Sequence, residues 1–143
     1  MPSVINLYKS VANNKKKILI AEDEPVLMEM YRVYFEKAGF EVLNAENGQV
    51  CIELAKKEKP DILLLDVLMP RLNGWDVLKE LKSNPETKDM PILVLSNLSQ
   101  TQEIQKGLAL GADDYIIKSD LTPKDLLAKV EKTILKSDSN TAN

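Results

Sequence analysis

The chain has 143 residues, of which 44% are hydrophobic and 29% charged, so it is large enough for one globular domain with its own core. Its net charge of -3 argues against a direct nucleic-acid partner, and no apolar run approaches the roughly 20 residues of a membrane span. The sequence contains no histidine and one cysteine, which excludes imidazole catalysis by the chain itself and an internal disulfide framework. We therefore expect a cytoplasmic protein without a membrane partner.

Short apolar runs alternate with segments of helical periodicity from Lys17 onward. The predicted strands are residues 18–21, 40–43, 62–65, 92–95 and 115–117. A helix follows each strand, and the punctuating residues are Gly39, Asn47, Pro60, Asn84-Pro85 and Thr122, with the fourth helix at about 100–110. This order predicts an α/β fold: a doubly wound five-stranded parallel sheet of strand order 2-1-3-4-5, with helices on both faces.

The same pattern sets the expected domain boundaries. Residues 17–136 are expected to form the folded domain. Residues 1–16 are interpreted as an N-terminal extension, either a frayed tail or a docking helix, and residues 137–143 as a polar C-terminal tail. Cys51 is interpreted as a half-buried residue of the second helix, and Trp75 as a packing residue of the third.

Four of the predicted strands end on polar residues. The first strand runs into Glu22 and Asp23, and the third runs into Asp66. The fourth strand ends at Ser96 and the fifth at Lys118. In open α/β sheets the ligand site lies beyond the carboxyl ends of the strands, so we expect these five side chains to meet in one crevice.

The acids among them predict a metal site. The carboxylates of Glu22, Asp23 and Asp66 would lie close together and repel one another. Such repulsion either raises the pKa of one of the acids or is relieved by a bound cation. Mg²⁺ fits because it is a hard ion that takes oxygen ligands. Without Asp66, the run Glu22-Asp23-Glu24 would be better explained as acids that cap the next helix, before Pro25. Asp66 at the end of the neighbouring strand favours the metal site instead.

The same residues predict phosphoryl transfer. Asp66 is the candidate nucleophile, because carboxylates form aspartyl-phosphates. Phosphoryl transfer requires mainly positioning and charge stabilisation, which Mg²⁺ and the ammonium of Lys118 would supply. Ser96 would donate a hydrogen bond to a phosphoryl oxygen. Each residue alone has an ordinary structural explanation, and their conjunction is the specific signal.

Four segments carry a resemblance to a known family. Across about residues 17–136 the chain resembles the receiver domains of two-component response regulators, especially single-domain regulators of the chemotaxis type. The segments that carry the resemblance are ILIAEDEP, ILLLDVLMPRLNGWD, ILVLSN and GADDYIIKS. The resemblance implies a flavodoxin-like fold. It also implies that Asp66 is phosphorylated by the phosphohistidine of a sensor histidine kinase or a phosphotransfer protein, as in a phosphorelay, and is slowly dephosphorylated.

The resemblance also assigns roles to further residues. It implies that Asp23, Asp66 and the backbone carbonyl of Leu68 ligate Mg²⁺, with Glu22 acting mainly through water. By the same resemblance, Lys118 is the family's active-site lysine. The switch residues that the family would place here are Ser96 and Tyr115.

Three positions depart from the usual family pattern. Glu22 stands where aspartate is commoner, and Asn97 stands where a small residue is usual. Ser119 stands where proline is usual, typically after a cis bond. A cis bond without proline costs roughly 2.5–4 kcal/mol, and the sequence leaves the Lys118–Ser119 isomer open.

We therefore expect a stand-alone signalling domain that catalyses only its own phosphoryl transfer and hydrolysis. After phosphorylation, the face of residues 97–136 would bind a downstream protein or a second copy. A phosphatase of the haloacid dehalogenase type would need a second acid where Leu68 stands, and acids after the first strand would repel the phosphate of an FMN carrier. A receiver-fold scaffold that binds partners without phosphorylation is the remaining alternative.

Overall fold

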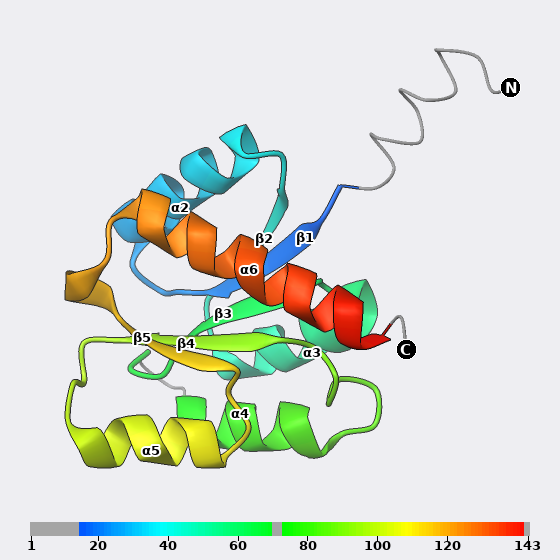
Figure 1. Ribbon diagram of the computed structural model, residues 1–143, viewed down its shortest axis with the longest axis vertical. Helices are drawn as coiled ribbons and strands as arrows, with labels where there is room; N and C mark the ends of the chain where they lie inside the picture. Colours follow the sequence, from blue (N-terminus) through cyan, green and yellow to red (C-terminus); the bar gives the residue numbers. More distant parts are fainter. Residues whose placement is uncertain (1–14, 70–72, 142–143) are drawn as a thin grey trace, which may run out of the picture.

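The computed structural model describes residues 15–69 and 73–141, which form a five-stranded sheet with helices on both faces (Figure 1). The strands are β1 (Lys17–Ala21), β2 (Glu41–Ala45), β3 (Ile62–Asp66), β4 (Ile92–Ser96) and β5 (Asp114–Ile117). The helices are α2 (Pro25–Lys37), α3 (Gly48–Glu58), α4 (Gly74–Ser83), α5 (Thr101–Ala109) and α6 (Pro123–Thr141), with a 3₁₀ turn η1 (Lys118–Asp120). The order is β2-β1-β3-β4-β5 and every pair is parallel, which confirms the predicted topology.

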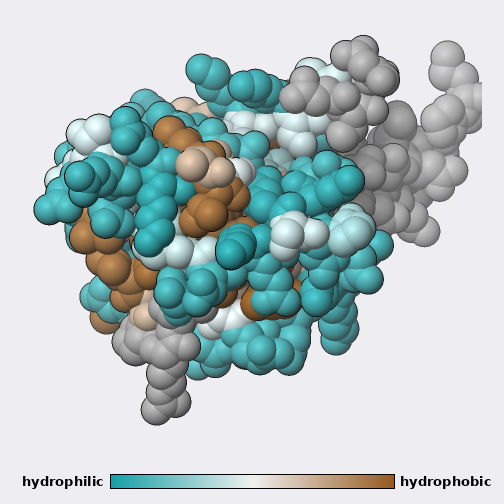
Figure 2. All heavy atoms as spheres, turned by 90° about the horizontal axis from the view of Figure 1, so that it is seen from below, coloured by the Kyte–Doolittle hydropathy of each residue, from teal (hydrophilic) through white to brown (hydrophobic). Residues whose placement is uncertain are grey.

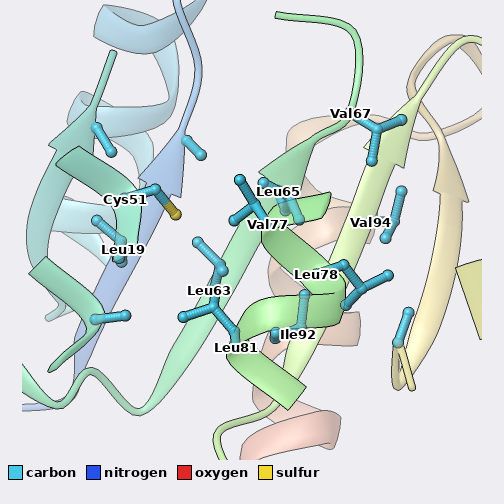
Figure 3. Packing of buried hydrophobic residues seen from close by; sticks show 14 of the residues in the cluster. Leu19, Cys51, Leu63, Leu65, Val67, Val77, Leu78, Leu81, Ile92 and Val94 are labelled. Carbon is cyan, nitrogen blue, oxygen red and sulfur yellow. The ribbon is translucent and has the colours of Figure 1, made fainter. Parts of the chain in front are cut away.

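The strands alternate their side chains between two hydrophobic cores. Leu63 and Leu65 face the core beneath α3 and α4, whereas Ile62 and Leu64 face the core beneath α2 and α6. Figure 3 shows Leu63 and Leu65 packing between β3 and α4. Both faces are covered, so β3 and β4 are buried along their whole length and their sequences lack the polar alternation of a half-exposed strand.

The helix boundaries follow the predicted capping residues. The side chain of Asn47 accepts a hydrogen bond from Val50 N (3.0 Å) at the start of α3. At the start of α6, Thr122 Oγ1 accepts from Asp125 N (3.2 Å) and donates to Asp125 Oδ2 (2.9 Å). Gly39 follows α2 with φ +96°, a backbone conformation that residues other than glycine rarely adopt.

The structure differs from the expectations in three places. Residues 137–141, expected as part of a polar tail, are helical because nothing after Pro123 breaks α6. Phe40 precedes β2, since its amide bonds to Phe35 O at the end of α2 (3.0 Å). Cys51 is fully buried rather than half-buried. The sequence leaves the isomer of the Lys118–Ser119 bond open, and in the structure this bond is trans, as is every other peptide bond of the described residues.

Some expectations fall outside the described residues. Residues 1–14 of the expected N-terminal extension lie there, as do residues 70–72 of the loop after β3 and the last two residues of the expected tail. Within the part of the chain that the structure describes, none of the helices is both long and apolar enough to cross a membrane.

Candidate functional site

The sheet register brings the predicted site residues to one edge in a stepped arrangement. Asp66 pairs with Leu95, and Leu95 pairs with Ile116. Because Ala21 pairs with Leu65, the residue after β1, Glu22, lies level with Asp66. Ser96 is then one residue beyond this row and Lys118 two residues beyond it.

Lys118 returns across these steps to contact two acids. Its ammonium lies 2.7 Å from Asp66 Oδ2 and 2.9 Å from Glu22 Oε1. The side chains of Asp66, Glu22 and Lys118 are 8%, 3% and 16% exposed, so little water screens these contacts. The other oxygen of Asp66, Oδ1, accepts a hydrogen bond from Leu68 N (2.9 Å). The candidate nucleophile is therefore fixed at both of its oxygens.

Glu22 is held by the backbone around it. Its Oε2 accepts from Asp23 N (3.0 Å), and its own N–H donates to Ala45 O (3.1 Å). Asn44 on β2 donates from Nδ2 to the carbonyls of Ile20 and Glu22, both at 3.1 Å. The sequence interpretation missed Asn44, although an amide inside the apolar run of β2 is a signal that could have indicated it.

Three carboxylates lie close enough to hold a divalent cation. One oxygen each from Glu22, Asp23 and Asp66 falls within 4.8 Å of the others. Asp23 is exposed, while the other two are buried. An all-carboxylate set with one solvent-facing member fits Mg²⁺, which prefers hard oxygen ligands and usually keeps several waters. This arrangement brings together the three acids predicted as metal ligands.

Burial and the ion contacts change two pKa values in the site. Burial alone would lower the pKa of Lys118, but its hydrogen bonds to Asp66 and Glu22 outweigh that effect and raise it. Burial raises the pKa of Glu22, and the hydrogen bond from Lys118 offsets this only in part. Lys118 is therefore an ammonium at physiological pH, as charge stabilisation of a phosphoryl group requires.

The two predicted switch residues, Ser96 and Tyr115, both form hydrogen bonds with the backbone of Leu98. Ser96 is fully buried, and its Oγ accepts a hydrogen bond from Leu98 N (3.0 Å). The hydroxyl of Tyr115 donates to Leu98 O (2.8 Å). Burial raises the pKa of Tyr115, and a hydrogen bond with Ser96 partly lowers it. Leu98 thus connects the two hydroxyls, which the sequence interpretation missed because a backbone contact carries no side-chain signal.

The fold and site define a receiver domain. Residues 18–131 match the family described as the response regulator receiver domain, and the chain belongs to this family. Response regulators are signalling proteins that are switched by phosphorylation and partner with histidine kinases. This membership excludes the haloacid dehalogenase and FMN-carrier alternatives.

Individual relatives agree with this assignment. The chain is 38% identical over 119 residues to the phosphate regulon transcriptional regulatory protein PhoB of Pseudomonas aeruginosa, covering 83% of this chain and 52% of PhoB. The chemotaxis protein CheY4 of Vibrio cholerae superposes with a TM-score of 0.77 at 28% identity, covering 83% and 98% of the two chains. The Francisella response regulator 1452 receiver domain gives 0.79 at 27% identity, covering 86% and 99%. The chain spans about half the length of the curated relatives it matches.

Proposed function

We propose that Asp66 accepts a phosphoryl group from the phosphohistidine of a sensor histidine kinase or a phosphotransfer protein. A carboxylate oxygen of Asp66 forms a bond to phosphorus as the phosphorus–nitrogen bond breaks, and the leaving imidazole takes up a proton. The observation that carries this proposal is the contact of 2.7 Å between Lys118 Nζ and Asp66 Oδ2 inside an acidic cluster. That cation can neutralise charge as the phosphoryl group transfers.

The cluster of Glu22, Asp23 and Asp66 would hold Mg²⁺, together with the backbone carbonyl of Leu68 that the family resemblance assigns. Bound there, Mg²⁺ would supply charge neutralisation to the phosphoryl oxygens. The side chains themselves position the nucleophile. Leu68 N fixes one oxygen of Asp66 and Lys118 fixes the other, so the carboxylate is oriented before the donor arrives.

The output of the reaction is a change at Ser96 and Tyr115. Ser96 Oγ turns from Leu98 N toward a phosphoryl oxygen on Asp66, where it donates a hydrogen bond. Tyr115, whose hydroxyl donates a hydrogen bond to the carbonyl of Leu98, follows Ser96 inward. The face of residues 97–136 then presents a different surface to a downstream protein or a second copy.

Apolar surface beside the site supports a protein as the phosphodonor. A cavity of about 260 Å³ borders Lys118 and Asn97, and most of the side chains that line it are apolar ones from α2, from the ends of β4 and β5, and from the start of α6 and the segment before it. Three apolar residues of α2 are also exposed to solvent: Val26 (79%), Met30 (43%) and Val33 (43%). A small phosphodonor would need only the polar site, whereas a docking protein can cover this surface.

The experiment is phosphorylation by acetyl phosphate with Mg²⁺, read as intact mass. We expect the wild type to gain one phosphoryl group, and chelation of the metal to prevent the gain. The Asp66→Asn variant keeps the shape of the side chain but lacks the nucleophile, so it should gain none. A phosphorylated Asp66→Asn protein would refute the assignment, and an unmodified wild type would favour the scaffold that works without phosphorylation.

A further inference from the structure

A groove of about 630 Å³ lies at the end of the sheet away from Asp66. Its walls are the end of α4 and the turn after it, the start of β5, and residues 129–137 of α6 (Figure 1). The groove is lined by residues that precede β4 and β5, whereas Asp66 is the last residue of β3, and all these strands are parallel. The side of the molecule that carries α4 and α5 is mainly hydrophilic with separate apolar patches (Figure 2). The groove is therefore a second site, suited to a polar ligand.

The groove concentrates positive charge in a chain whose net charge is -3. Five lysines and three aspartates line it, and none of its lining residues is aromatic or an arginine. The lysines are Lys82, Lys88, Lys129, Lys132 and Lys136. A concave surface with an excess of one charge raises the local concentration of ligands of the opposite charge. The groove therefore favours anions.

Two of these lysines are paired with aspartates and join the walls of the groove. Lys82 Nζ lies 3.3 Å from Asp113 Oδ2 and donates a hydrogen bond to Met90 O (2.8 Å), which connects α4 to the residues before β4 and β5. Lys129 Nζ lies 3.2 Å from Asp114 Oδ2, which connects α6 to β5. These contacts hold the walls together before any ligand binds, so little ordering is needed on binding.

The other three lysines have ammonium groups that an anion can reach. Within the part of the chain that the structure describes, Lys88, Lys132 and Lys136 form no ion pair. Lys132 and Lys136 lie four residues apart on one face of α6, where like charges repel each other. Among the described residues, Asp89 is the one lining acid that also lacks an ion pair, so three unpaired ammonium groups face one unpaired carboxylate. A bound anion would relieve the repulsion along α6.

The residue types of the lining favour phosphate groups. Lysine binds phosphate as a point charge, whereas the planar fork of arginine, which matches a carboxylate, is absent from the lining. The lining also lacks an aromatic ring on which a base could stack. Three ammonium groups on two walls can contact more than one phosphate, and the volume is typical of a small-molecule site.

We propose that this groove binds a small molecule with a chain of two or more phosphates, either an inorganic oligophosphate or the phosphate tail of a nucleotide. Lys132 and Lys136 contact the chain from α6, and Lys88 contacts it from the turn after α4. The proposal concerns a site separate from Asp66 and holds whether or not Asp66 is phosphorylated.

Calorimetric titration of the full chain with inorganic triphosphate, in a buffer that contains a chelator in place of Mg²⁺, tests the proposal. We expect one saturable site, and at least tenfold weaker binding of orthophosphate. Lys132→Gln combined with Lys136→Gln should weaken triphosphate binding at least tenfold, because two of the three unpaired ammonium groups are lost. Lys57→Gln combined with Lys124→Gln is the matched control: it removes the same charge from exposed positions outside the groove and should bind as the wild type does.

Two further arms sharpen the test. Asp89→Asn removes the unpaired carboxylate and should strengthen triphosphate binding. ATP distinguishes the two sources: binding equal to that of inorganic triphosphate indicates a nucleotide tail, and weaker binding indicates an inorganic oligophosphate.

Three results would overturn the proposal. The first is the absence of saturable binding by the wild type. The second is an equal affinity in the two double variants, which would mean that triphosphate binds elsewhere or responds only to net charge. The third is tighter binding of a DNA duplex that depends on Lys132 and Lys136, because the groove would then be part of a nucleic-acid surface.

Discussion

The ammonium of Lys118 separates two carboxylates that water hardly reaches. Asp66 and Glu22 would face each other without a counter-charge if Lys118 were lost. Removing one partner of a buried ion pair is costly because the other charge stays buried. Since the pKa of Lys118 is raised, its contribution is complete below its unfolded-state pKa and is lost only as the pH rises through the folded-state value. The protonation of Lys118 itself therefore does not change between acidic and neutral pH, and any pH dependence in that range comes from its carboxylate partners.

We expect Lys118→Met to lower the free energy of unfolding by about 3 kcal/mol at neutral pH, at the low end of the range for such losses. At acidic pH the loss should shrink, because the raised pKa of Glu22 means that this carboxyl group takes up its proton early and the repulsion ends. Urea unfolding at both pH values measures the effect. Lys82→Met is the control: its partner Asp113 has a side chain 42% exposed, so its loss should vary little with pH. An equal loss in Lys118→Met at both pH values would contradict the prediction.

Leu68 and Asn97 lead to a prediction about the lifetime of the phosphorylated state. Leu68 is 54% exposed and Asn97 is also exposed. By resemblance to the family, we expect their side chains to flank the approach of the hydrolytic water. Leu68 cannot orient a water, and Asn97 adds bulk. We expect Leu68→Asn and Asn97→Ala to speed the decay of phospho-Asp66, about tenfold if each lowers the barrier by about 1.4 kcal/mol. The decay of the phosphoprotein is followed by intact mass. If both variants decay at the wild-type rate or more slowly, the prediction is wrong.

At the scale of elements, the junction between β3 and α4 depends on close approach at Gly74. A Cβ at Gly74 would lie 2.3 Å from Val67 Cα, a contact that requires the backbone to move. A glycine at the start of a helix would ordinarily be replaced by alanine with a gain in stability. Here we expect Gly74→Ala to destabilise the protein by about 2 kcal/mol, as overpacking does.

Gly39→Ala is the matched comparison for this prediction. A Cβ at Gly39 meets nothing within 4 Å, and only the φ of +96° opposes it. Its cost should therefore be about 1 kcal/mol, from the left-handed backbone alone. Chemical denaturation of the two variants distinguishes steric crowding from backbone strain, and a smaller loss for Gly74→Ala than for Gly39→Ala would show that the crowding is relieved.

The elements show which features the sequence could predict. The strands, their order and the caps at Asn47 and Thr122 depend on local pattern and chain connectivity, and these were confirmed. The polar residues after Lys136 predict the end of a helix, but no helix breaker is present among them and α6 continues to Thr141. Contacts between distant segments, such as Trp75 on Tyr115, have no local signal. The helical pattern around Cys51 predicts only half-burial, because it carries no information on how closely α3 packs this residue against the sheet.

At the scale of the whole molecule, metal binding should stabilise the fold by mass action. A ligand that binds only the folded state at a hundred times its dissociation constant adds about 2.7 kcal/mol to the free energy of unfolding. We expect Mg²⁺ to raise the thermal midpoint and to change the fluorescence of Trp75, which stacks on Tyr115. Asp23 is exposed, so Asp23→Ala should leave the fold intact and weaken Mg²⁺ binding at least tenfold. An unchanged titration in Asp23→Ala would place the metal elsewhere.

The stepped register of the sheet determines which changes of chain length the molecule can tolerate. Glu22 and Asp66 share a row, and Ser96 and Lys118 lie one and two residues beyond it. The number of residues in each strand thus determines where the site residue at its end lies. Deleting one residue within a strand would turn the site residue that follows it to the opposite face of the sheet. Insertions in the loops at the opposite end of the strands leave the number of residues within each strand unchanged. Natural variation in length should therefore collect at that edge, and the spacing inside β1, β3, β4 and β5 should stay constant wherever this chemistry is kept.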